Sequence, residues 1–168
     1  LGDADAYSEN LGSVEFIADE RQYLKKREKL QAVALFQNAE KGLNISFQLT
    51  GEEGKSLVVI VSHIPENFTL PIKARFAVSN NFDGENPVAT LLFMHADENG
   101  MLSTPIPYEG VLTINRLSEM EMTFEVQAQG GYATETDSPA SWKPVIVSGV
   151  LKSPIIQTFG IDKQNVLR

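Results

Sequence analysis

A cluster of basic residues near the N-terminus is the first candidate for a binding surface. It consists of Arg21, Lys25, Lys26, Arg27 and Lys29, which are five of the 14 basic residues of the chain. Clustered cations of this kind can bind a polyanion or an acidic glycan. The residues before the cluster carry only acidic charges, so the cluster could equally be a solvated edge that faces this acidic segment. The sequence leaves both interpretations open.

A polar loop with aromatic residues is the second candidate. Tyr132 follows two glycines, and Trp142, the only tryptophan, closes the polar stretch that leads to Lys143. Long loops on sheet scaffolds often carry binding sites, and an exposed aromatic ring can stack on a sugar or fill a partner's pocket. We therefore name Tyr132, Trp142 and Lys143 as candidate ligand-binding residues for a glycan or a surface protein. The alternative is that Trp142 is a hydrophobic plug beneath the loop.

Motifs for catalysis or metal binding are not recognisable in the sequence. His63 and His95 are the only histidines, and a metal site would need both of them close to a carboxylate such as Asp97 or Glu98. The chain contains no cysteine, no Gly-x-Ser-x-Gly motif and no phosphate-binding glycine loop. We therefore expect no catalytic residue, metal or cofactor. A carboxylate pair could still be hidden among the 22 acidic residues, so a hydrolase or lyase stays open.

The elements that must position these residues are β-strands. Apolar and polar residues alternate in residues 43–49, 71–78 and 122–129. Successive side chains of a strand point to opposite faces, so this period of two describes strands with one buried and one solvated face. Strands are predicted near residues 13–18, 31–37, 43–49, 57–63, 70–78, 88–95, 109–116, 122–129 and 145–152. All eight prolines fall between these strands or at a first residue, as a sheet protein requires.

The segment 19–30, which contains the basic cluster, permits two secondary structures. Tyr23, Leu24 and Leu30, with good helix formers between them, could make a short helix of two or three turns. The same residues fit an edge strand or an extended loop, in which lysines prevent unwanted strand pairing. We favour the extended structure and keep the short helix near 19–30 as an alternative.

The expected fold is all-β, an antiparallel β-sandwich of about eight to ten strands. Residues 1–12 are expected to be a flexible acidic tether, and residues 13–168 a single domain. The core is expected to contain Phe16, Ile45, Phe47, Ile60, Phe76, Phe93, Ile114, Phe124, Val126 and Val147. At this length a domain buries roughly 70% of the surface that its unfolded chain exposes, so a substantial core is possible without disulfides.

The charge of the chain limits the classes of partner. The net charge is −8, which argues against nucleic acid, because nucleic-acid binding requires clustered Lys and Arg to displace counterions.

The first ten residues are small, acidic and aperiodic, which is typical of a segment that follows a removed signal sequence. We therefore expect an exported protein, at the cell surface or in the periplasm.

The order of strands in the second half carries a resemblance to a known group of proteins. Residues 110–115 (GVLTIN), 122–128 (MTFEVQA) and 145–155 (VIVSGVLKSPI) follow one another, after VEFIA at 14–18 and the strand at 43–49. This arrangement resembles small bacterial surface lipoproteins of unknown function. The resemblance implies an exported antiparallel β-sandwich, attached to a membrane only through a lipid on a cysteine that would precede this sequence, and it supplies no catalytic residue. The chain departs from the group in the charged segment 21–29.

Three functional hypotheses follow from these observations. The first is a non-enzymatic binding or structural module at the cell surface, which presents the loop at 130–143 to a glycan or protein. The second is a carboxylate-based hydrolase or lyase. The third is a lipocalin-like barrel that encloses an apolar small molecule.

Overall fold

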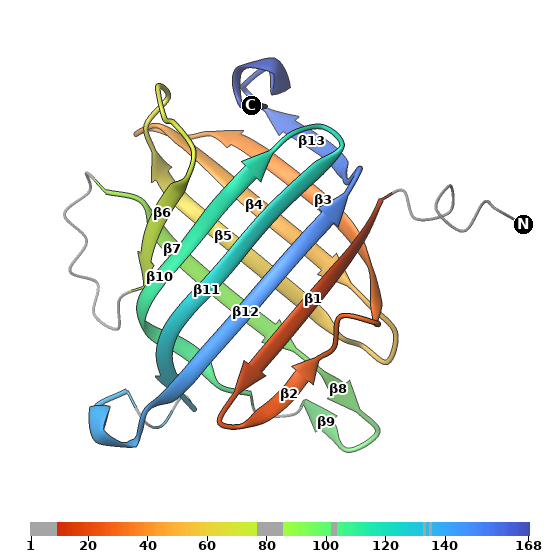
Figure 1. Ribbon diagram of the computed structural model, residues 1–168, viewed down its shortest axis with the longest axis vertical. Coiled ribbons are helices and arrows are strands. Elements are labelled where there is room, and N and C mark those ends of the chain that lie inside the picture. Colours follow the sequence, from red (N-terminus) through yellow and green to blue (C-terminus); the bar gives the residue numbers. More distant parts are fainter. Residues whose placement is uncertain (1–9, 77–85, 102–103, 133, 135) are drawn as a thin grey trace, which may run out of the picture.

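The computed structural model describes residues 10–76, 86–101, 104–132, 134 and 136–168, and its ribbon is drawn in Figure 1. The strands are β1 (Leu11–Ala18), β2 (Arg21–Leu24), β3 (Lys29–Asn38), β4 (Leu43–Thr50), β5 (Ser56–Ile64), β6 (Ile72–Phe76), β7 (Val88–Met94), β8 (Ala96–Asp97), β9 (Gly100–Met101), β10 (Ile106–Leu117), β11 (Glu121–Gly131), β12 (Lys143–Lys152) and β13 (Ile155–Phe159), with short 3-10 turns η3 (Pro139–Ser141) and η4 (Lys163–Asn165). The nine strands predicted from the sequence are confirmed as β1, β3 to β7 and β10 to β12. The end of the expected strand at 70–78, residues 77 and 78, lies outside the described residues.

The sheet closes into a barrel, so the expected sandwich is wrong. Nine strands form the ring in the order β1, β3, β4, β5, β7, β6, β10, β11, β12, and back to β1. Closure depends on β1, which pairs along its whole length with β12 and, through Leu11, Gly12 and Ser13, also with Gln31, Leu30 and Lys29 of β3. A strand in a sandwich and a strand in a barrel have the same apolar alternation, because each has one buried face. The alternation therefore predicted the strands and could not predict the closure.

An odd number of strands explains the one parallel pair in the ring. Around a closed ring the strand direction must return to its starting value, so the number of antiparallel pairs has to be even. The pair β6–β7 is parallel, and the other pairs of the ring are antiparallel. Within the described residues β6 and β7 share one registered pair, Arg75 with Val88, beside a hydrogen bond from the Arg75 N–H to the Pro87 carbonyl.

The segment 19–30 is not helical, which corrects the alternative kept for it. Asp19 and Glu20 both have positive φ angles, 50° and 62°. Two such residues form the tight turn that suits a two-residue β-hairpin, and a right-handed helix would need negative values. The chain therefore turns back after Ala18, pairs β2 with β1, and starts β3 at Lys29. The basic cluster thus lies on β2, on the following turn and at the start of β3.

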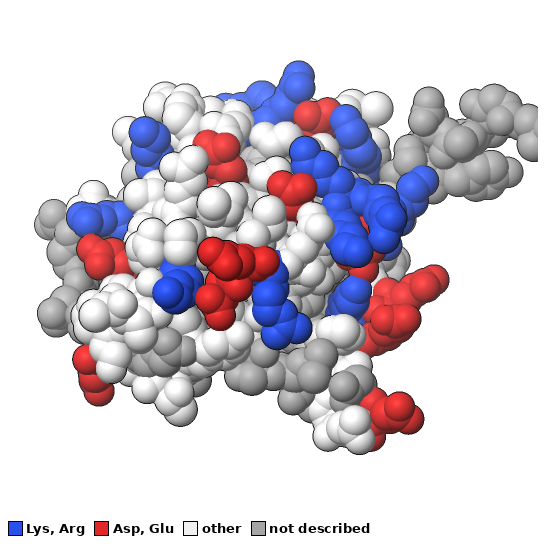
Figure 2. All heavy atoms as spheres, turned by 60° about the horizontal axis from the view of Figure 1, so that its bottom comes forward, with Lys and Arg blue, Asp and Glu red and all other residues white. Residues whose placement is uncertain are grey.

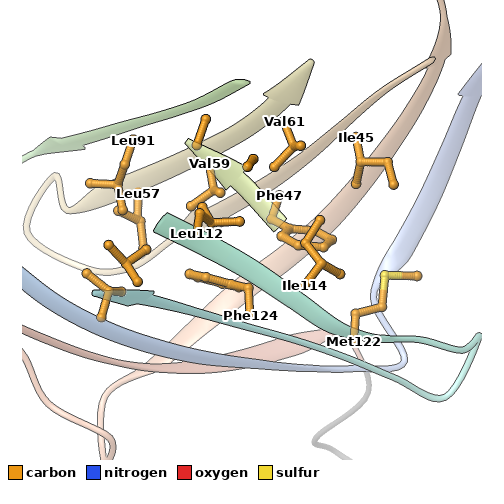
Figure 3. Close-up of a cluster of buried hydrophobic side chains, with 14 of the residues drawn as sticks. Ile45, Phe47, Leu57, Val59, Val61, Leu91, Leu112, Ile114, Met122 and Phe124 are labelled. Atoms are coloured by element: carbon orange, nitrogen blue, oxygen red, sulfur yellow. The ribbon is translucent and has the colours of Figure 1, made fainter. Parts of the chain in front are cut away.

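The barrel interior is filled by apolar side chains from opposite walls. Phe47 of β4 and Phe124 of β11 come from strands far apart in the ring, and their rings stack with centroids 5.6 Å apart (Figure 3). The expected core residues are buried except Ile60, which is half-buried on the outer face of β5. That error came from the continuous apolar run 57–61, in which alternation cannot reveal the inward face; the inward residues are Leu57, Val59 and Val61.

Candidate functional site: a basic groove at one end of the barrel

A groove of about 410 Å³ lies at the end of the barrel where β1 turns into β2. Arg21 and Tyr23 line it from β2, Lys25, Arg27 and Glu28 from the turn before β3, Lys55 from the β4–β5 turn, and His95 and Thr104 from the segment after β7, with Gln22 completing the wall. We call this hollow the basic groove. Figure 2, which turns this end of the barrel forward, shows Lys and Arg side chains gathered on one side of it, with acidic side chains among them.

The lining of the basic groove is positive, although the protein is acidic overall. Four lining residues are basic and one, Glu28, is acidic, while the whole chain carries a net charge of −8. Arg21, Lys25 and Arg27 are exposed, and in the described part of the chain none of the three forms an ion pair. Among the described residues the groove therefore presents three exposed cations without a salt bridge, of which Lys25 also interacts with the charge of the Glu28 carboxylate.

Glu28 fixes the shape of the groove. One oxygen of its carboxylate accepts a hydrogen bond from the Lys55 ammonium, and the other accepts one from the backbone N–H of Lys25 at 2.7 Å. Burial alone would raise the pKa of this carboxyl, but the hydrogen bonds and the charges of Lys55 and Lys25 lower it below its ordinary value. The ionised Glu28 thus ties the turn after β2 to the β4–β5 turn and holds Lys55 in place.

Tyr23 forms the boundary between the groove and the apolar interior. Its ring packs edge-on against Phe16 and Phe93, with centroids 5.5 and 6.1 Å away, and the Arg21 guanidinium lies 5.4 Å from its centre. Burial raises the pKa of the Tyr23 hydroxyl to about 12, and its hydrogen bond with Tyr132 contributes to the rise. The hydroxyl is therefore neutral at physiological pH and adds no negative charge to the groove.

A smaller hollow of about 100 Å³ lies beside the basic groove, and we call it the small hollow. It is lined by Asp19, Pro105, Gly130, Gly131, Tyr132, Ser141, Lys143 and Val145. The buried Tyr108 hydroxyl donates a hydrogen bond to the backbone carbonyl of Tyr132. The Trp142 ring packs on Tyr108 with centroids 5.2 Å apart. These contacts join the loop after β11 to the barrel wall.

Two tyrosines connect the hollows. The hydroxyl oxygens of Tyr23, in the basic groove, and Tyr132, in the small hollow, lie 3.4 Å apart, within hydrogen-bonding distance. Thr104 lines the groove, and its neighbour Pro105 lines the small hollow. The two sets of residues that the sequence singled out separately therefore meet at one end of the barrel.

The predicted polyanion-binding residues and the predicted ligand-binding residues belong only in part to the two hollows. Arg21, Lys25 and Arg27 line the basic groove, whereas Lys26 and Lys29 do not. Tyr132 and Lys143 line the small hollow. Trp142 lines neither hollow; it is half-buried, with its ring against Tyr108.

Several site residues escaped the sequence analysis. Lys55 and Glu28 join the site only because the β4–β5 turn folds against the turn after β2, and their separation in the sequence gives no sign of this. Tyr108 stands at the start of a strand and carries no motif.

The two histidines that were considered for a metal site lie far apart. His95 lines the basic groove, while His63, near the end of β5, lies at the opposite end of the barrel. In the described residues no group of three or more His, Asp or Glu side chains could bind a metal ion.

Comparison with known proteins gives no family for this chain. No protein-family model, curated protein or solved structure matches it significantly. Among the described residues there is also no helix with the length and apolar character needed to span a membrane. The resemblance to surface lipoproteins, with the export and lipid anchor that it implies, stays a prediction.

Proposed function

We propose that the protein is a non-enzymatic binding module that holds the anionic group of a ligand in the basic groove. The observation that carries the proposal is the set of Arg21, Lys25 and Arg27, three cations without an ion-pair partner among the described residues, around a hollow in a protein of net charge −8. Like charges close together repel one another, and a bound anion relieves that repulsion.

The rigidity of the groove supports this proposal. Glu28, Lys55 and the Lys25 backbone fix the turn that carries Lys25 and Arg27, and the packed ring of Tyr23 supports Arg21. A site whose backbone is already ordered loses less conformational entropy when a ligand binds. Carboxylate, sulfate and phosphate groups all suit Arg and Lys donors.

The second hypothesis, a carboxylate-based hydrolase or lyase, gains no specific support. Among the residues that the structure describes, Glu28 is the only acid that lines the basic groove and Asp19 the only acid that lines the small hollow. A general acid needs a raised pKa, and the pKa of Glu28 is lowered. We therefore do not assign a reaction to this end of the barrel.

The closed barrel is compatible with the third hypothesis, a lipocalin-like carrier. However, Phe47 and Phe124 meet in the interior from distant strands, and Phe16 and Phe93 do so near the groove with centroids 5.3 Å apart. These two aromatic pairs occupy interior space that a carrier would keep for its ligand. For this reason we place the ligand in the basic groove and not inside the barrel.

A titration with glucuronate, followed by the amide signals in a two-dimensional NMR spectrum, tests the proposal, with glucose as the uncharged control. We expect glucuronate alone to shift signals of residues that line the basic groove. The double variant Lys25→Gln/Arg27→Gln should weaken binding by about tenfold, the effect of losing charge-assisted contacts worth about 1.4 kcal/mol.

The matched control is the double variant Lys26→Gln/Lys29→Gln. It removes the same charge from the same segment, but at exposed residues that do not line the groove, so it should change the affinity less than about twofold, as expected for charges that are screened by solvent and do not contact the ligand. Equal losses in the two variants would show that binding follows overall charge and not the groove. An unchanged spectrum of the wild-type protein with glucuronate would refute the proposal.

A further inference from the structure

We infer that the basic groove and the small hollow form one elongated site, and that its ligand is an acidic oligosaccharide. An anionic sugar would occupy the basic groove, and the neighbouring sugar would place its hydroxyl groups in the small hollow. The inference rests on the proposed function, because it takes the basic groove as the anion site.

The first observation is that the two hollows are adjacent, with lining residues that are neighbours at three places. Tyr23 and Tyr132 contribute one ring each and meet through hydroxyls 3.4 Å apart. On one side Asp19 of the small hollow and Arg21 of the basic groove belong to the same hairpin. On the other side Thr104 and Pro105 are consecutive residues. A ligand seated in one hollow therefore needs to extend only across the pair of tyrosine hydroxyls to enter the other.

The second observation is that the small hollow has a different chemistry from the basic groove. Its carboxylate, Asp19, accepts hydrogen bonds, and its ammonium, Lys143, donates them. The Ser141 hydroxyl donates to the Ser138 carbonyl at 2.7 Å, which leaves its oxygen as an acceptor. A ligand that serves all three must donate two hydrogen bonds and accept one, and two neighbouring hydroxyls of a sugar can do so.

These groups also argue against a chain in which every unit is anionic. In a polyphosphate each unit carries negative charge, so a unit in the small hollow would lie beside the Asp19 carboxylate and be repelled by it. A hollow of about 100 Å³ has room for the hydroxyl-bearing edge of one sugar.

Calorimetric titration with ligands of increasing length tests the inference. The probes are glucuronate, a disaccharide of glucuronate linked to a neutral sugar, and tripolyphosphate as an anionic chain without hydroxyl-bearing carbon. We expect the wild-type protein to bind the disaccharide about tenfold more tightly than glucuronate. In the variant Ser141→Ala/Lys143→Gln this gain should disappear, while the affinity for glucuronate stays within about twofold and shows that the variant is folded. Tripolyphosphate should show no dependence on Ser141 or Lys143.

The outcomes separate this inference from the proposed function. If glucuronate fails to bind, the proposed function is refuted, and the inference falls with it. If glucuronate binds and the disaccharide binds no better, or if the gain survives in the variant, the elongated site is refuted while the anion site stands. If tripolyphosphate binds more tightly than the disaccharide and loses affinity in the variant, the small hollow recognises charge, and the assignment to an oligosaccharide is wrong.

Discussion

The carboxylate of Glu28 lies among the cations of the basic groove and bonds to two of its neighbours. Because the Lys55 ammonium and the Lys25 N–H stabilise its ionised form, its pKa in the folded protein lies below the value of 4.5 that it has without these contacts. A carboxyl with a lowered folded pKa adds stability at pH values above its unfolded pKa, and this contribution is lost as the pH falls through the folded pKa. Glu28 is therefore a structural residue whose effect depends on pH.

The variant Glu28→Gln tests this role. At neutral pH the substitution should lower the free energy of unfolding by about 1 kcal/mol or less, since the ion pair is partly exposed and screened by solvent. Below the ordinary pKa of 4.5 the difference from the wild type should shrink, because the wild-type carboxyl becomes protonated. Urea unfolding at a series of pH values measures both effects. Glu125→Gln, an exposed change on the outer face of β11, is the control, and a difference that grew in acid would contradict the assignment.

At the scale of residues, part of the candidate site could be predicted from the sequence. The density of charge in residues 21–29 identified the cations, but the side chains that line the groove depend on the turn held by Glu28. Lys26 does not line the groove, although its neighbours Lys25 and Arg27 do. A glycine pair before Tyr132 marked the second loop, whereas the hydrogen bond from Tyr108 that positions Tyr132 follows only from the fold.

At the scale of elements, the pairing between β6 and β7 is the shortest in the ring among the described residues. Within the described residues one registered pair joins these strands, whereas β10 and β11 pair along almost their full length. Backbone N–H groups in an extensive ladder exchange with solvent only in the larger opening events, while those beside a short junction exchange in local ones. The ring should therefore open first between β6 and β7.

Hydrogen exchange measured by mass spectrometry tests this expectation. Amides of β6 that face β7 should exchange at least about tenfold faster than amides of β11, since local opening costs less free energy than global unfolding. The amides of β10 that bond to β11 are the internal reference, because β10 also forms the other neighbour of β6. If β6 and β11 were equally protected, the barrel would be continuous across this junction.

The elements themselves were largely predictable. Each of the nine strands of the ring shows either the period of two or a short apolar run between turns, and both signals are local. The hairpin β1–β2 was ambiguous because Glu20 stands where a glycine usually follows the first residue of such a turn. The strand β13 also escaped, since its exposed residues show no alternation of burial.

At the scale of the whole molecule, the closed ring converts a set of amphipathic strands into one interior. Closure depends on pairs between residues 11–13 and 29–31, and a short stretch of sequence contains no signal for such a contact. The same strands in an open arrangement would bury the same faces, which is why a sandwich was expected. The stack of Phe47 on Phe124 is specific to the barrel, because it joins distant strands of the ring across its interior.

Replacing Phe124 by alanine tests whether this interior is a single packed unit. The Phe124 side chain is 1% exposed, stacks on Phe47, and fills the space over Gly149, where a Cβ atom would lie 2.3 Å from the ring. The variant Phe124→Ala should lose about 3–5 kcal/mol of unfolding free energy, because it removes these contacts and leaves a cavity. The control is Phe159→Ala, the same substitution at a ring that is 58% exposed on β13, which should cost less than about 1 kcal/mol. Urea unfolding followed by far-UV circular dichroism compares the two. Equal losses, or a loss below about 1 kcal/mol for Phe124→Ala, would mean that the opposite walls of the barrel do not meet through Phe124.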